Sequence, residues 1–223
     1  LVHTALADPD AVSNGTDAEP PGEQQARDRK AAISVEERRE AIARAACDVI
    51  SRKGFAASSI REIADATGMH VPTLYQYVSS KDEVLELVYR WVIRDVKDSI
   101  AEALRLPLPP AEKLVAVTSR LLEVNARTPR HTGVLNRELR SLSKSARARV
   151  LGEYEAIMTS VSDIIVEGIE LGEFRAVNPR IAANFIDALC DMWALRQFAV
   201  GQFSLDEYES EVIKYIKSGL FIS

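Results

Sequence analysis

The chain has 223 residues, 47% of them hydrophobic, and its 28 Lys and Arg stand against 33 Asp and Glu for a formal net charge of −5. This length allows one or two domains with a sizeable core, and the apolar content excludes a wholly disordered chain. Two cysteines exclude a secreted disulfide scaffold, and the apolar runs are too short to span a bilayer. The net acidity excludes a protein that coats nucleic acid through bulk charge, but it leaves room for a small DNA-contacting surface.

Residues 1–33 carry turn-forming pairs such as Asp-Pro, Asn-Gly and Pro-Pro and few bulky apolar side chains. We therefore predict a disordered N-terminal arm, and its lack of a signal peptide's apolar core favours a cytoplasmic protein. Three basic residues, Arg27, Arg29 and Lys30, cluster near the end of the arm. Two interpretations stay open: a solvated leader, or a basic arm that reaches into a DNA minor groove.

Beyond the arm the sequence has the start and stop signals of helices. A capping box over 34–37 opens a helix that Gly54 can end. Two short helices are expected over 59–67 and 70–78, each with a start signal in its first turn. Another serine-led capping box then opens a long helix over about 81–106.

Prolines force a break after this long helix, and the later segments again have apolar side chains at helical spacing. Further helices are expected over about 110–127, 131–142, 144–171, 178–200 and 204–221. We find no strand alternation, no hairpin signal and no internal repeat. The sequence therefore predicts an all-α fold with about nine helices.

The two short helices form the most informative part of the chain. They are joined by a few residues that include Gly68, which can adopt the positive φ that a tight turn needs. That arrangement is typical of a helix-turn-helix, whose second helix enters the DNA major groove. On this second helix Leu74 and Val78 point inward, and the remaining face offers hydroxyl and amide groups suited to phosphates and base edges.

A block of about 36–84 resembles the DNA-binding domain of TetR-type (TetR/AcrR) transcriptional repressors in order and spacing. The residues that carry the resemblance are Gly54-Phe55, Ser59-Ile60-Arg61-Glu62-Ile63-Ala64, Gly68, Thr73-Leu74-Tyr75-Gln76-Tyr77-Val78 and Ser80-Lys81-Asp82-Glu83. The resemblance implies a three-helix DNA-binding domain over 34–80 and a helical ligand-binding and dimerisation domain over 81–223. It further implies a ligand-responsive repressor that binds a pseudo-palindromic operator in double-stranded DNA as a homodimer.

Carried over residue by residue, the resemblance implies a set of DNA contacts. The implied phosphate contacts are Ser58, Ser59, Arg61, Thr73, Tyr75 and Lys81, and the implied base-edge contacts are Val71, Pro72, Gln76 and Tyr77. The apolar pair at the start of the second helix would read thymine methyl groups. Tyr77 and Val78 depart from the family's commoner histidine and phenylalanine, which leaves the base preference open. Packing against the first helix is the alternative role for both tyrosines.

The same resemblance assigns dimerisation to the last two long helices, over about 178–221. Each of them carries an apolar stripe, and the first stripe is large and aromatic for a small domain. The stripes are Ile181, Phe185, Leu189, Met192, Trp193 and Phe198 on one helix and Tyr208, Val212, Ile216 and Leu220 on the other.

An effector pocket is implied between the long middle helices. The candidate lining residues are Trp91, Leu121, Asn125, Leu135, Tyr154, Met158, Val161, Phe185 and Trp193, and each of them has plain core packing as its alternative. These side chains favour a hydrophobic or amphipathic effector. Five basic residues over 137–149 are either a solvated surface or a contact for the phosphates of an acyl-CoA-like effector. The segment 167–174 also faintly resembles repressors that sense acyl-CoA thioesters.

Enzymatic function has no support in the sequence, and we expect neither a cofactor nor a metal. There is no Gly-rich phosphate loop, and the three histidines lie in different elements without metal-ligand spacing. Cys47 and Cys190 lie on apolar faces, where they act as small hydrophobes, with a redox sensor as the alternative. The competing function is a helical ligand-binding or scaffold protein that does not read DNA.

Overall fold

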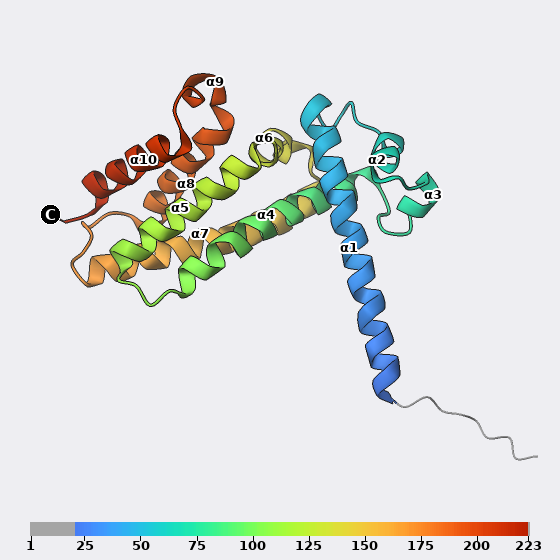
Figure 1. The fold of residues 1–223 in the computed structure, drawn as a ribbon, viewed down its shortest axis with the longest axis horizontal. Coiled ribbons are helices and arrows are strands. Elements are labelled where there is room, and N and C mark those ends of the chain that lie inside the picture. Colours follow the sequence, from blue (N-terminus) through green and yellow to red (C-terminus); the bar gives the residue numbers. More distant parts are fainter. Residues whose placement is uncertain (1–20, 223) are drawn as a thin grey trace, which may run out of the picture. The chain divides into compact units, whose positions relative to one another are not determined.

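The computed structural model describes the backbone of residues 21–222 and the side chains of residues 35–222. It divides into two units, Leu1–Glu37 and Arg38–Ser223, which we describe separately. The helices, drawn in Figure 1, are α1 (Pro21–Lys53), α2 (Ile60–Thr67), α3 (Val71–Leu74), α4 (Lys81–Arg105), α5 (Pro110–Arg127), α6 (Pro129–Glu138), the 3-10 turn η1 (Leu139–Ser141), α7 (Lys144–Glu170), α8 (Pro179–Leu195), α9 (Gln197–Val200) and α10 (Leu205–Leu220). The predicted all-α fold is confirmed, and the β content of the described residues is one isolated bridge between Phe174 and Phe221.

The first helix begins earlier than the sequence predicted. It starts at Pro21 instead of at the capping box over 34–37, so α1 includes residues 21–33 of the expected arm. Residues 23–33 are rich in Glu, Gln, Ala, Arg and Lys and contain no Pro or Gly that would stop a helix. The rest of the expected arm, residues 1–20, lies outside the described residues, as do the side chains of the basic cluster near its end.

Several helix starts follow the predicted capping chemistry. Ser59 and Ser204 each form a full capping box with the glutamate three residues later, and the Asn178 side chain accepts the N–H of Ile181 ahead of α8. The start of α4 has half of its box, because Glu83 donates its N–H to Ser80 but its carboxylate accepts from Ser79 instead. These signals could be predicted because both partners lie within one helical turn.

Other boundaries differ from the expected ones. The second short helix is regular only over α3, and the chain continues to Val78 in tighter turns, with Gln76 donating its N–H to the Thr73 carbonyl. The helix expected over 131–142 begins at Pro129, where proline fits a first helical turn, and ends in η1. The helix expected over 178–200 is interrupted at Arg196, whose backbone leaves the helical region, so that α8 and α9 are separate.

In the second unit four long helices enclose the core. α4, α5, α7 and α8 pack against one another, α6 packs against α8, and α10 lies across α5 and α8 (Figure 1). Buried side chains such as Leu85, Leu114, Leu122 and Ile165 fill the space between them. These elements place the short helices α2 and α3 at the start of α4 and surround a cavity further along it.

Close packing at the end of α7 explains the two glycines there. Phe174 is fully buried, and a Cβ on Gly168 would stand 2.2 Å from its ring. Gly172 has a φ of 75°, which glycine adopts without strain and which turns the chain toward Phe174. The glycine pair therefore makes room for an aromatic side chain and a tight turn.

Candidate functional site

The helix-turn-helix is built by one cap, one glycine and a small core. α2 begins at Ser59 and ends at Gly68, which has a φ of 67° and donates its N–H to the last carbonyls of α2. Ile63, Ala64 and Leu74 are buried between the helices. This packing fixes the face of α3 that points away from the core.

That outer face carries most of the predicted DNA contacts. The exposed residues are Arg61, Pro72, Tyr75 and Gln76, while Val71, Thr73, Tyr77 and Lys81 are half-buried. Tyr75 is 48% exposed, so packing against the first helix does not account for it. Tyr77 is partly packed on the core, which favours the packing alternative for part of its ring.

The hydroxyls of two serines predicted to contact phosphates have hydrogen-bond partners within the chain. Ser58 is 5% exposed and its Oγ donates to the Phe55 carbonyl at 2.7 Å, so its hydroxyl already has a partner within the chain. The Ser59 hydroxyl is engaged in the cap of α2, where it donates to Glu62 at 2.8 Å. Lys81 donates to the Ala56 carbonyl at 3.3 Å and lies 4.4 Å from the Phe55 ring centroid, which stabilises the turn before α2.

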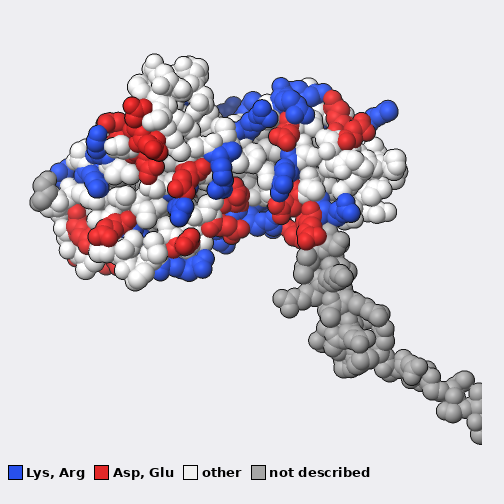
Figure 2. Space-filling model, viewed as in Figure 1, with Lys and Arg blue, Asp and Glu red and all other residues white. Residues whose placement is uncertain are grey.

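An arginine that the sequence did not single out supports the end of this motif. Arg39 donates to the Tyr77 carbonyl at 2.7 Å and pairs with Glu83 at 3.3 Å. The partners are 38 residues apart in one case and 44 in the other, so local sequence patterns give no signal for them. In the view of Figure 2, Lys and Arg are interspersed with Asp and Glu and do not form one large basic patch.

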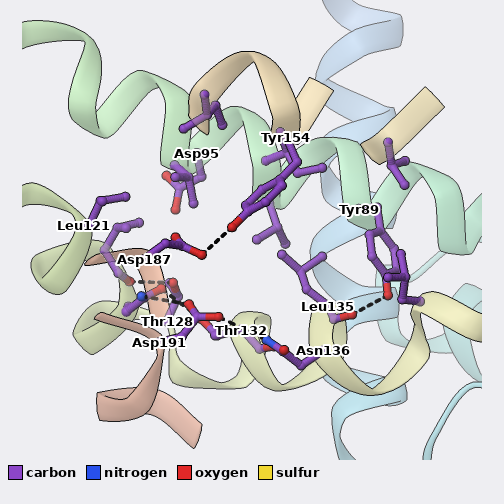
Figure 3. A pocket seen from close by; sticks show the side chains of 18 of the residues that line it. Tyr89, Asp95, Leu121, Thr128, Thr132, Leu135, Asn136, Tyr154, Asp187 and Asp191 are labelled. Carbon is purple, nitrogen blue, oxygen red and sulfur yellow. Dashed lines mark hydrogen bonds between the residues drawn. The ribbon is translucent and has the colours of Figure 1, made fainter. Parts of the chain in front are cut away.

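A cavity of about 390 Å³ lies among α4, α5, α6, α7 and α8 (Figure 3). Its walls are largely apolar, with Val92, Ile93 and Ile157 among them. Four of the nine predicted pocket residues line it. These are Leu121, Asn125, Leu135 and Tyr154.

The other five predicted pocket residues lie elsewhere. Trp91 packs edge-on against His131 with ring centroids 4.6 Å apart, and Met158 and Val161 are core residues. Phe185 is 67% exposed, and Trp193 packs on Tyr208. Helical periodicity identifies the inward face of a helix, but it does not separate residues that fill a core from residues that line a void.

A polar network that the sequence did not predict forms one side of the cavity. Asp191 accepts from the amides of Asn125 and Asn136, at 3.2 Å each, and the Tyr154 hydroxyl donates to Asp187 (Figure 3). Thr132 completes the network by donating to Asn125 at 2.9 Å. Two aspartates four residues apart on a helix that also carries a long apolar stripe are the signal that could have indicated it.

Burial controls the protonation of these acids. It raises the pKa of Asp187 to about 6, with the charge of Asp191 adding to the effect and the Tyr154 hydrogen bond opposing it. Burial also raises the pKa of Asp191, against the two amide donors. A third carboxylate, Asp95, lines the cavity, and its described lining includes no Lys, Arg or His.

The two apolar stripes predicted for dimerisation differ in the structure. On α8 and α9, Ile181, Phe185 and Phe198 are more than half exposed, which leaves an apolar face uncovered within one chain. On α10 the predicted residues Val212, Ile216 and Leu220 are buried in the core of the chain itself, so this stripe is covered within one chain. Leu189, Trp193 and Tyr208 are half-buried, and Met192 is exposed.

The basic run over 137–149 is partly used in internal contacts. Arg137 donates to the carbonyls of Ile50 and Ser51 at the end of α1, at 3.0 and 3.5 Å. Arg149 forms a bidentate pair with Glu86, both hydrogen bonds being 2.7 Å. Arg137 and Arg149 are therefore not simply solvated, because each of them connects two helices.

Neither a metal site nor a membrane span is found in the described part of the chain. Among its residues no group of three or more potential ligands is placed to hold a metal ion. No helix within that part is both long and apolar enough to cross a membrane.

Comparisons with known proteins match both halves of the chain. The family model described as "Bacterial regulatory proteins, tetR family" matches residues 42–88, and the one described as "Tetracyclin repressor-like, C-terminal domain" matches residues 107–220. The HTH-type transcriptional regulator HbdR of Aromatoleum sp. (strain CIB) is 29% identical over 180 residues, which are 79% of this chain and 78% of that protein.

Solved structures share the fold at lower identity. FadR from Bacillus subtilis, in complex with stearoyl-CoA, has a TM-score of 0.69 and 23% identity, covering 80% of this chain and 97% of the other. AibR, in complex with isovaleryl coenzyme A and operator DNA, has a TM-score of 0.71 and 16% identity over the same shares of the two chains.

Proposed function

Since the chain belongs to the tetR family of bacterial regulatory proteins and is a ligand-responsive transcriptional regulator, we propose that it is a cytoplasmic repressor. An effector releases it from its operator by binding in the cavity lined by α4, α5, α6, α7 and α8, called the α4–α8 cavity below. The observation that carries the proposal is the combination of an outward polar face on α3 with a cavity in the attached helical domain. α4 joins the two, because it starts at Lys81 beside the motif and lines the cavity further on.

The DNA contacts are assigned by exposure and chemistry. Arg61 and Tyr75 reach phosphates, with Lys81 and Thr73 supporting them, and these contacts set affinity and register. Pro72 and Gln76 present an apolar surface and an amide to base edges, with Val71 and Tyr77 behind them. The family resemblance supports these roles, and the exposed positions on α2 and α3 are compatible with them.

A dimer formed through α8 and α9 supplies a second helix-turn-helix for the operator. The exposed aromatic and aliphatic side chains of these helices form an apolar face of the kind that marks a protein interface. A two-fold dimer would place two α3 helices in successive major grooves, about 34 Å apart. The operator would then be a pseudo-palindrome.

The effector is a hydrophobic or amphipathic molecule, in keeping with the apolar walls of the cavity. The AibR and FadR structures hold acyl-CoA compounds, which makes an acyl-CoA-like molecule one candidate. Such a molecule releases DNA only if it binds the DNA-incompetent state more tightly than the competent one.

Selection and sequencing of DNA bound by the purified full-length protein tests the proposal. We expect enrichment of a pseudo-palindrome and loss of binding as salt rises. A single asymmetric half-site, bound equally well when its neighbour is deleted, would contradict the dimeric operator. Absence of any sequence preference would instead favour a helical ligand-binding protein that does not read DNA.

A further inference from the structure

The charged side chains that line the α4–α8 cavity are all acidic. Asp95 comes from α4, and Asp187 and Asp191 come from α8, one helical turn apart. The other polar lining groups are neutral hydroxyls and amides, including Asn125 and Asn136. Asp95 pairs with Arg127 outside the lining at 3.6 Å, but no Lys, Arg or His among the described lining residues balances Asp187 and Asp191.

From this arrangement we propose that the effector is an organic cation: a protonated amine on an apolar body, with the amine against Asp187 and Asp191. The proposal rests on the function proposed above, since it names the ligand class of the same cavity. The cavity itself is the site, and the carboxylates decide which ligands it accepts.

The hydrogen-bond arrangement leaves capacity for such a ligand. Each oxygen of Asp191 accepts one amide hydrogen bond, and Asp187 accepts one from Tyr154. An ionised carboxylate has about four lone-pair sites, so further donors can be accepted on both side chains. Neither acid has an ion-pair partner among the described residues, and a buried carboxylate without one is unfavourable. An incoming ammonium supplies the missing charge and the missing donors.

The apolar walls account for the rest of the ligand. Val92, Ile93 and Ile157 line the cavity, and a volume of about 390 Å³ accommodates an alkyl or ring body. A fatty-acid carboxylate or a phosphate placed at the same polar side would meet Asp187 and Asp191 as like charges. The cavity therefore discriminates between amphiphiles by the sign of the head group.

Three probes with one alkyl tail and different head groups test this inference on the full-length protein: decylamine, decan-1-ol and decanoate. Calorimetric titration below the micellar range should show decylamine binding at least about tenfold more tightly than the alcohol, with decanoate weakest. Equal affinity for amine and alcohol, preference for decanoate, or binding of none of the three overturns the proposal, and these measurements need no variant.

Variants then locate the head group. Asp187→Asn combined with Asp191→Asn should remove most of the advantage of decylamine over decan-1-ol and leave the alcohol unchanged. Asp163→Asn, an exposed carboxylate on α7 away from the cavity, is the matched control and should leave the advantage intact. An equal loss in the control variant, or full retention in the cavity variant, overturns the assignment.

Operator binding distinguishes failure of the ligand class from failure of the function. If decanoyl-CoA releases the selected operator and decylamine neither binds nor releases it, the cation proposal fails and the repressor stands. If decylamine binds selectively but the protein has no operator, the repressor fails and the cation site stands.

Discussion

Replacing Asp187 with asparagine should stabilise the protein, and the gain should grow with pH. Burial raises the pKa of this carboxyl from 3.8 to about 6. The folded chain therefore holds the proton more tightly than the unfolded chain, and its stability falls as the pH rises from about 4 to about 6. Above that window the full difference of about two pKa units applies, which is about 3 kcal/mol. Asparagine is nearly isosteric and can still accept from Tyr154, but it has no charge to bury.

The expected gain is thus about 3 kcal/mol at pH 8 and about half of that at pH 5. Urea unfolding followed by circular dichroism, at fixed protomer concentration and at both pH values, measures it. Asp163→Asn serves as the exposed control and should change little at either pH. A variant that is no more stable than the parent at pH 8, or whose gain is independent of pH, would refute the account of a buried, unpaired carboxylate.

Three further changes address other parts of the molecule. Arg61→Ala should weaken binding to specific and random DNA alike and reduce the slope of log affinity against log salt by about one unit, measured by fluorescence anisotropy; loss on the specific site alone would contradict a phosphate role. Gly168→Ala should destabilise the fold by about 1–3 kcal/mol in urea because its methyl group meets the Phe174 ring, whereas Gly152→Ala, with nothing within 4 Å, should be neutral or stabilising. Phe185→Glu should weaken dimerisation by about 2 kcal/mol, roughly thirtyfold, in sedimentation, and an unchanged dimer would place the interface elsewhere; Leu171→Glu, at a similarly exposed residue after α7 and outside α8 and α9, is its control.

Local chemistry made the helices predictable, and long-range packing limited the rest. Ser59 and Ser204 reveal their caps because the partner lies three residues away. The stripe on α10 has the same pattern whether it meets a second chain or its own core, and the structure places Val212 in that core. The periodicity of a single sequence does not distinguish a helix face that packs on a second chain from one that packs on its own core.

The candidate site shows the same limit. The order of Gly68 and the short helices around it was enough to predict the helix-turn-helix and the polar outer face of its second helix, and the family resemblance added Arg61 and Tyr75 as phosphate contacts. The acid pair was missed because its meaning depends on a void formed by five helices, and Asp187 and Asp191 each looked like an ordinary polar residue on α8. The burial of Ser58 could not be read from the sequence, because the hydrogen bond from its hydroxyl to the Phe55 carbonyl forms only in the folded turn.

The contact between Arg137 and the end of α1 connects the helix-turn-helix domain to α6. The continuous chain of α4 joins this domain to the rest of the unit, and further links to α1 come from the hydrogen bonds of Arg137 to Ile50 and Ser51 and from the ion pairs Arg94–Glu40 and Arg130–Asp48. A rotation of the helix-turn-helix domain that involved α4 alone would lengthen the Arg137 hydrogen bonds. Either α6 therefore moves with the domain, or the hydrogen bonds of the Arg137 guanidinium break. Hydrogen bonds to a charged group contribute about 1.5–3 kcal/mol. An effector that acts by breaking the Arg137 hydrogen bonds must therefore bind the state without them roughly ten- to a hundredfold more tightly than the state that has them, whatever its chemistry.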